Sequence, residues 1–255
     1  MPAFGKRDVG ALLEGVPLMR GLDAEAWELA NVEILQLTFE IDDGQTEDLI
    51  PKALHPTIPP IIYFSVHRFP DSPAGPFLLA QARIGCRAGV RPRGYLTMAY
   101  VDSAPAADAL ASGWGFACRQ GEISLRRYHD RIELSVEAGG RVQLEAALVG
   151  PEPISGGDVQ YVANMNAARL EGPAGEEPIL VQVDPEFTFH RADRGKPAVS
   201  QFSAEGWNAD GVRLAYPVSA SFAVVDTGFP RIRYVVNPER PALVGTRKVT
   251  ASAKN

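Results

Sequence analysis

Glycine and proline, spread along the whole chain, are the feature that most limits what this sequence can fold into. The 255 residues include 24 glycines and 21 prolines, and both residue types interrupt helices. Between them lie segments in which polar and apolar residues alternate, as in half-buried β-strands. We therefore expect a β-rich α+β fold with few short helices. A barrel is the most economical form, because closing a sheet removes its exposed edges.

The expected strands are of two kinds. Most alternate between polar and apolar residues, whereas residues 61–69 and 94–102 are more continuously apolar, which favours a central place in a sheet. The segments, in chain order, are residues 33–42, 61–69, 94–102, 123–137 (as a hairpin), 141–149, 177–192 and 213–226.

Helices are expected to be scarce. Residues 102–113 form the clearest candidate, because Asp102 or Ser103 can cap the start of an alanine-rich body. Residues 23–32 predict a short amphipathic helix. Residues 163–170 fit either a helical turn or a strand, and their periodicity does not decide between the two.

The length of the chain fits one large domain or two small ones. No internal repeat is visible, and the proline- and glycine-rich stretches read as loops within one domain. We expect a single domain over residues 1–255, with its core at about 30–240. The small, polar end of the chain, residues 245–255, is expected to be flexible.

Composition argues against several classes of function. The net charge of -6 disfavours a general nucleic-acid binder, and no segment approaches the roughly 20 apolar residues of a membrane span. The two cysteines show no CxxC pair, so a reducing cytoplasm is the expected location. The four histidines lack metal-ligand spacing, and no glycine-rich phosphate loop is present. We expect neither a metal nor a cofactor.

Four segments carry a resemblance to a known family. Residues 39–69 contain "LIPKALHP", residues 75–89 begin "GPFLLA", residues 94–125 contain "YVD" and "GWGFACRQGEI", and residues 161–187 contain "NMNAARL". In this order and spacing they resemble the "LLPxxLxP", "GPYxEA", "YVD…GFPKK" and "NxxxxK" segments of the acetoacetate decarboxylase superfamily. The resemblance extends over about residues 33–190.

This resemblance implies a single domain built around a cone-shaped β-barrel with a ligand pocket inside, and assembly into homo-oligomers. It also implies a chemistry, because the founding members decarboxylate acetoacetate. They do so through a lysine Schiff base, and the pKa of that lysine is lowered by a desolvated site and a neighbouring cation.

The segment "GFACRQG" departs from the family pattern. The alignment puts Cys118 on the Schiff-base lysine, Arg119 on its charged neighbour, Ala117 on the proline and Leu79 on the family's carboxylate. Cysteine cannot form the protonated imine, so a Schiff-base decarboxylase is not expected. A relocated amine at Lys52 stays open. The chain has five lysines, and none lies in a segment that resembles the catalytic one: Lys6, Lys52, Lys196, Lys248 and Lys254.

Four residues are candidates for catalysis. Arg119 suits an anion clamp, unless it is an exposed or structurally paired arginine. Cys118 is either a nucleophile activated by Arg119 or a small apolar filler. If the strand continues, Glu122 lies on the face of Cys118 and is a possible acid or base, although it also reads as a polar strand start. His67 is a general-base candidate, or a structural histidine.

Further residues are candidates for substrate binding. Tyr63 and His67 share one face of a strand, and Arg68 lies on the other face, at its rim. Gln81 and Arg83 fall in the segment that lines the pocket in the family. The remaining candidates come from the aromatic and polar residues around Cys118 and from a later strand: Trp114, Phe116, Gln120 and His190.

Three functions remain open. The first is a lyase-type enzyme, namely a dehydratase, hydratase, aldolase or isomerase. It acts on a small keto acid, hydroxy acid or enone by acid/base chemistry without a Schiff base. The second is a non-catalytic protein that binds a small carboxylate or ketone on the same barrel. The third is a true decarboxylase with a relocated lysine.

Overall fold

One continuous β-sheet organises the chain in the computed structural model, which describes residues 3–42 and 46–250. Neighbouring strands follow the order β16-β15-β12-β11-β6-β5-β4-β2-β14-β13-β10-β9-β8, and β1, β3 and β7 pair at the side of this path. The strands are β1 (Leu18–Met19), β2 (Trp27–Ile41), β3 (His55–Pro56), β4 (Ile61–Phe69), β5 (Phe77–Ala88), β6 (Arg91–Val101), β7 (Cys118–Gln120), β8 (Glu122–Arg127), β9 (Arg131–Ala138), β10 (Arg141–Pro153), β11 (Asn164–Gly172), β12 (Gly175–Val183), β13 (Thr188–Phe202), β14 (Leu214–Phe229), β15 (Tyr234–Val236) and β16 (Thr246–Lys248).

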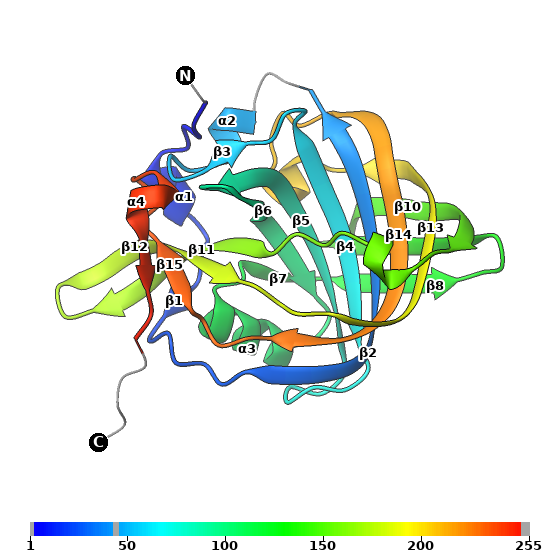
Figure 1. Cartoon of the computed structure of the whole chain (residues 1–255), viewed down its shortest axis with the longest axis horizontal. Coiled ribbons are helices and arrows are strands. Elements are labelled where there is room, and N and C mark those ends of the chain that lie inside the picture. The colour runs from blue at the N-terminus through cyan, green and yellow to red at the C-terminus, as the bar shows by residue number, and fades with distance from the viewer. Residues whose placement is uncertain (1–2, 43–45, 251–255) are drawn as a thin grey trace.

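The long strands curve around a common centre, which confirms the β-rich, cone-like fold (Figure 1). Within the described residues the path of paired strands runs from β16 to β8 without returning to its start. The sheet is therefore open at β16 and β8, and it keeps the cone-like form that the resemblance implied (Figure 1). The helices are short: α1 (Val9–Leu13), α2 (Thr46–Leu49), α3 (Ala104–Trp114), α4 (Ala242–Gly245) and the 3-10 turns η1 (Gly156–Asp158) and η2 (Glu205–Trp207).

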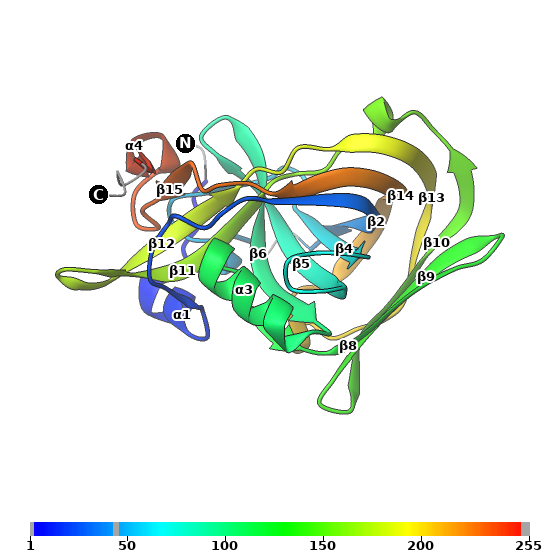
Figure 2. The ribbon, with the colours of Figure 1, turned by 90° about the horizontal axis from the view of Figure 1, so that it is seen from below.

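Helix α3 forms where the sequence predicted one. The side chain of Ser103 caps its first turn by accepting a hydrogen bond from the Ala106 N–H. The helix ends at Gly115, whose φ of 68° lies in the left-handed region that favours glycine. A Cβ at this position would also lie 3.1 Å from the Ala168 Cβ. The helix buries Trp114 and packs on the outer side of the sheet (Figure 2).

Two other sequence expectations have different outcomes. The helix expected at 23–32 is wrong: β2 begins at Trp27 and pairs with the last residues of β14. Partners nearly 200 residues away in the chain outweighed the local helical pattern here. The undecided segment 163–170 belongs to strand β11. At the C-terminus, β16 pairs with β15, and residues 251–255 of the expected flexible tail lie outside the described residues.

Both faces of the central strands are buried. One face packs against β8–β10 and η2 in a core that includes Phe64, Val66 and Trp207. The other packs against α3 in a second core that includes Leu79 and Phe229. This double burial explains why the sequence of β4 is more continuously apolar than alternating. It also means that a polar residue in the middle of these strands, such as Ser65 or Gln81, is enclosed and needs partners.

Candidate functional site

A small cavity of about 40 Å³ opens on the α3 side of the sheet. Its polar side chains come from four strands: His67 on β4, Gln81 on β5, Asn164 on β11 and Thr227 on β14, whose hydroxyl donates to the Glu186 carbonyl at 2.8 Å. The remaining lining is apolar or small: Phe69, Leu79, Phe116, Val183, Pro185, Phe187, Gly228 and Phe229. The volume is enough for about three water molecules or a ligand of a few heavy atoms.

The register of β4 and β5 brings the polar residues together. Ser65 lies opposite Gln81, and His67 lies opposite Leu79. Opposite residues point to the same face of a sheet, and alternate residues along a strand share a face. Phe64 lies in the core on the other face, as the alternation in the sequence predicted.

Arg83 lies beside the cavity and is only 4% exposed. It holds together a polar cluster that consists of Gln36, Ser65, Gln81 and Asn164. Its Nη1 donates to the Val162 carbonyl at 2.8 Å and to Asn164 Oδ1 at 2.9 Å. Its Nη2 donates to Gln36 Oε1 at 3.0 Å and to Ser65 Oγ at 3.4 Å. The cluster extends toward the cavity because Asn164 Nδ2 donates to Gln81 Oε1 at 2.6 Å.

The guanidinium of Arg83 has no carboxylate partner among the described residues. Burial lowers the pKa of Arg83 to about 10, so the group remains charged at neutral pH. Its Nε lacks a hydrogen-bond partner, as does the buried hydroxyl of Tyr161. Tyr63 lies beside the guanidinium, with its ring centre 5.8 Å from the arginine Cζ. The interior next to the cavity therefore carries an uncompensated positive charge.

His67 is neutral under ordinary conditions. Burial, and secondarily the charge of Arg83, lower its pKa to about 3. Its Nε2 lies 3.3 Å from Ser65 Oγ and 3.5 Å from Gln81 Nε2. The other ring nitrogen, Nδ1, has no hydrogen-bond partner among the described residues. It is not one of the fully buried polar atoms that lack a partner. An imidazole in this state can donate or accept a hydrogen bond, but it carries no charge.

Cys118 and Arg119, which the resemblance aligns with the Schiff-base lysine and its charged neighbour, point in opposite directions. Both belong to β7, where successive side chains alternate between faces. Cys118 packs against the core under α3, and burial raises the pKa of its thiol to about 12. Arg119 is exposed, donates to Asn208 Oδ1 at 3.4 Å, and lines an open groove of about 770 Å³ on the other surface. A half-buried thiol with a raised pKa and no base beside it is a poor nucleophile.

The structure separates the other sequence candidates. Phe116 lines the cavity, whereas Trp114 is buried in the core and donates from Nε1 to the Pro230 carbonyl at 2.7 Å. Gln120 and Glu122 are exposed.

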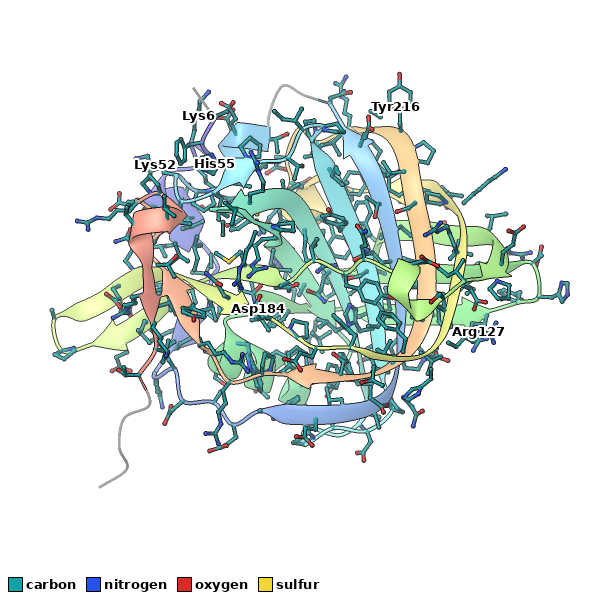
Figure 3. The ribbon with its side chains drawn as sticks, viewed as in Figure 1. Lys6, Lys52, His55, Arg127, Asp184 and Tyr216 are labelled. Carbon is teal, nitrogen blue, oxygen red and sulfur yellow. The ribbon has the colours of Figure 1, made fainter. Side chains whose placement is uncertain are left out.

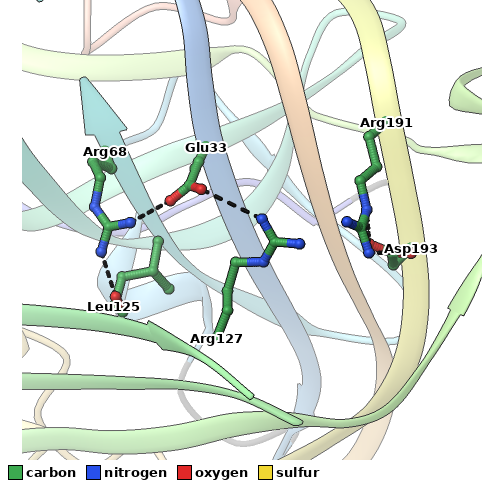
Figure 4. A network of polar contacts seen from close by, with 6 residues as sticks. All are labelled: Glu33, Arg68, Leu125, Arg127, Arg191 and Asp193. Atoms are coloured by element: carbon green, nitrogen blue, oxygen red, sulfur yellow. Dashed lines mark hydrogen bonds and ion pairs between the residues drawn. The ribbon is translucent and has the colours of Figure 1, made fainter. Parts of the chain in front are cut away.

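Two further candidates have partners at the surface. His190 is partly exposed, and its Nε2 lies 2.9 Å from the Asp226 carboxylate. Arg68 pairs with Glu33 and also donates to the Leu125 carbonyl, at the rim as expected (Figure 4).

Asn164 and Gln36 are the polar residues that the sequence did not single out. The sequence did contain a sign that Asn164 is important, because it is a polar residue in a segment that is otherwise suited to burial. That segment could not be assigned to a strand, and its contact with Gln81 spans 83 positions of sequence. A contact of such length is not visible in local patterns.

No described lysine reaches the cavity. The four that the structure describes, Lys6, Lys52, Lys196 and Lys248, are all exposed. Lys6 and Lys52 lie at the outside of the molecule (Figure 3). Over residues 3–42 and 46–250, no group of three or more His, Cys, Asp or Glu side chains could hold a metal ion. No helix in the same part of the chain is long and apolar enough to cross a membrane.

Comparison with known proteins gives one match by family. The family model described as acetoacetate decarboxylase matches residues 16–195. Among curated proteins, none matches the chain in sequence.

Solved structures match in fold at low identity. The acetoacetate decarboxylase of Legionella pneumophila is 16% identical with a TM-score of 0.71, covering 82% of this chain and 86% of that one. The enduracididine biosynthesis enzyme MppR, bound to a condensation product of pyruvate and imidazole 4-carboxaldehyde, is 15% identical with a TM-score of 0.67, covering 82% and 89%. An acetoacetate decarboxylase-like enzyme of Sphingomonas wittichii RW1 is 17% identical with a TM-score of 0.60, covering 81% and 91%.

Proposed function

Because this chain belongs to the acetoacetate decarboxylase family, we propose that it is a lyase-type enzyme whose reaction passes through an enolate of a small carbonyl compound. The substrate is a keto acid, a hydroxy acid or an enone, and no Schiff base forms. The observation that carries this proposal is the cavity itself. A neutral imidazole and two amides line a space for a few heavy atoms, and a buried guanidinium without a carboxylate partner lies behind one of the amides.

The positive charge of Arg83 favours an anion in the cavity. A carboxylate or a developing enolate there is stabilised by the field of the guanidinium and by the amide groups of Gln81 and Asn164. Groups that are fixed in place before the reaction need no reorganisation when charge develops. Arg83 acts through these amides and takes the role that the sequence had suggested for Arg119.

His67 is the residue we assign to proton movement. A neutral imidazole can polarise a carbonyl and give its proton to the oxygen of the enolate that forms when a cavity water takes the proton from carbon. The neighbouring cation favours that transfer, and the ring regains its proton from the same water. MppR, a fold relative, was solved with pyruvate bound. That ligand belongs to the class of small keto acids proposed for this chain.

The proposal also covers the domain organisation, the oligomeric state and the cellular location of the protein. We propose one domain for the whole chain, a homo-oligomer, and a cytoplasmic location. The family resemblance supports the first two, and the cysteine content supports the third.

Hydrogen exchange tests the proposal without knowledge of the natural substrate. Wild-type protein in D₂O should catalyse deuterium incorporation at the methyl group of pyruvate, followed by ¹H NMR. The His67→Gln variant should be slower by about 10²-fold or more, as expected for the loss of an acid/base group. Borohydride with acetoacetate should leave every lysine unmodified in mass spectrometry. Exchange that is absent from wild type, or equal in His67→Gln, would contradict the enzyme assignment.

A binding protein is the second candidate. One observation favours it: no Asp, Glu or Lys stands among the residues that line the cavity, so the lining offers no ordinary charged base. A binding protein predicts that pyruvate shifts the NMR signals of the cavity residues while deuterium exchange stays at the uncatalysed rate.

A further inference from the structure

We propose that Arg83 fixes the direction of every hydrogen bond between itself and the cavity, so that the amide and imidazole groups of the lining offer donors to a ligand. The site then selects ligands whose polar group only accepts, namely ketones, carboxylates and enolates. This inference deepens the proposed function and rests on the cavity being its site.

The argument begins with the chemistry of arginine. A guanidinium has N–H donors and no acceptor. The atom of Asn164 that lies 2.9 Å from Arg83 Nη1 must therefore be the amide oxygen, and the other atom must be the nitrogen. Gln36 provides a check, because its oxygen faces Arg83 while its nitrogen donates to the Gln160 carbonyl at 3.2 Å. The orientations of both amides follow from their partners alone.

The same logic extends to the cavity. Asn164 Nδ2 is a donor, so the Gln81 atom at 2.6 Å is the oxygen, and the Gln81 nitrogen faces His67. Each amide accepts a hydrogen bond at its oxygen, on the side of Arg83, and donates one from its nitrogen, on the side of the cavity. The chain of amides thus transmits the donor character of Arg83 over two side chains.

His67 is oriented from two sides. Gln81 Nε2 points at its Nε2 as a donor, over a long 3.5 Å contact. Ser65 Oγ accepts from Arg83, which leaves its own proton for His67 Nε2 at 3.3 Å. Nε2 is therefore the acceptor, and the proton of the neutral ring resides on Nδ1.

What remains for a ligand is a set of N–H groups. Asn164 Nδ2 and Gln81 Nε2 each carry a second hydrogen without a partner among the described residues, and His67 carries the hydrogen on Nδ1. The acceptor atom of each of these three residues already accepts a hydrogen bond from a neighbouring side chain. The rest of the lining is mostly apolar and offers no compensating side-chain carboxylate.

Ligands that must donate are therefore rejected. An ammonium or amidinium group would meet N–H donors and the field of Arg83, and a buried donor without an acceptor costs about 1–3 kcal/mol. A ketone or carboxylate of the same size would receive up to three hydrogen bonds.

Three isosteric probes test this selectivity: acetate, acetamide and acetamidinium, with acetone as an uncharged acceptor. Binding to wild-type protein is measured by NMR titration of the ¹⁵N-histidine and backbone signals. We expect acetate and acetone to bind about tenfold or more tightly than acetamidinium, with acetamide between them. Equal binding of acetate and acetamidinium would overturn the proposal. Binding of acetate but not acetone would reduce it to attraction by charge, which also overturns it.

The variant Asn164→Asp reverses the chain of donors. An aspartate accepts from Arg83 but cannot donate to Gln81 Oε1, so the amide of Gln81 turns and presents its oxygen to His67. We expect the His67 proton to move to Nε2 and the preference between acetone and acetamidinium to invert. The exposed Gln120→Glu variant adds the same charge outside the cavity and should leave both unchanged.

The position of the proton on His67 in the wild-type protein gives a result that needs no variant. Long-range ¹H–¹⁵N NMR spectra distinguish a proton on Nδ1 from one on Nε2, and His67→Gln assigns the signal. A proton on Nε2 overturns the inference even if Asn164→Asp fails to fold. These outcomes are independent of turnover. If the probes bind in the expected order but pyruvate does not exchange deuterium, only the assignment as an enzyme is contradicted. If pyruvate exchanges deuterium but the His67 proton lies on Nε2, only the donor arrangement is contradicted.

Discussion

Two clusters around arginine on the same sheet are built in different ways. At the rim, Arg68 is about one third exposed, pairs with Glu33 and holds the carbonyl of Leu125 (Figure 4). Arg127 approaches the same carboxylate at 3.6 Å. Beside the cavity, Arg83 is almost fully buried and is surrounded by neutral oxygens alone.

This difference separates a structural role from a functional one. The carboxylate of Glu33 neutralises charge where β8 approaches β2 and β4, so the rim cluster fastens strands. Leaving Arg83 without a counter-charge costs desolvation energy that a carboxylate partner would offset. An arrangement that keeps this charge free is suited to an anion that arrives and leaves.

The largest expected difference lies in stability. Arg83→Met removes the donor from buried acceptors, and each unsatisfied group costs about 1–3 kcal/mol, so we expect a loss of at least about 3 kcal/mol in the free energy of unfolding. Arg68→Met breaks a partly exposed pair and should cost about 1 kcal/mol. Urea unfolding of both variants measures this. A larger loss of stability in Arg68→Met than in Arg83→Met would contradict the energetic difference between the two clusters.

The pH dependence of stability follows from His67. Its folded-state pKa of about 3 lies below the value near 6.5 of an unfolded histidine, so the unfolded chain binds a proton that the folded chain does not. Stability therefore falls as the pH drops below about 6.5. At pH 5 the wild type should lose about 2 kcal/mol that His67→Gln does not lose.

Urea unfolding of the two proteins at pH 7 and pH 5 gives this difference, and the carboxylates common to both proteins cancel in the comparison. Parallel pH dependence of the two proteins would mean that His67 titrates normally and is not enclosed beside Arg83.

Cys118 is expected to react slowly. Burial holds the pKa of the thiol at about 12, so almost no thiolate is present at pH 8. Labelling with iodoacetamide at pH 8, followed by mass spectrometry, should be slower by about tenfold or more than for an unfolded control in urea. Rapid and stoichiometric labelling of the folded protein would restore Cys118 as a candidate nucleophile.

The smallest effect is expected at Arg119. Its side chain is exposed and lies on the opposite face of β7 from the half-buried Cys118. Arg119→Ala should change the free energy of unfolding by less than about 0.5 kcal/mol and leave the affinity for acetate unchanged within error. A marked loss of acetate binding would move the site to the open groove.

The sequence predicted the parts of this molecule that depend on local pattern. The cap at Ser103 predicted α3, and alternation in β4 placed Tyr63 and His67 on one face. It could not separate Cys118 from Arg119 by alignment to a family motif, because such an alignment carries roles and not the direction of side chains. Nor could it find Asn164, whose role comes from pairing across the fold.

The mistaken helix at 23–32 has the same cause. The segment suggested a short amphipathic helix, but Leu29 and Val32 are buried in a strand that pairs with β14. Tertiary pairing decided the conformation, and local propensity did not.

A crystal structure with acetate or pyruvate bound tests the central claim most directly. The account predicts ligand oxygen atoms within about 3.2 Å of His67 Nδ1, Gln81 Nε2 or Asn164 Nδ2, enclosed by Phe116 and Phe229. A ligand bound instead to Arg119 in the open groove, with the cavity filled only by water, would contradict it.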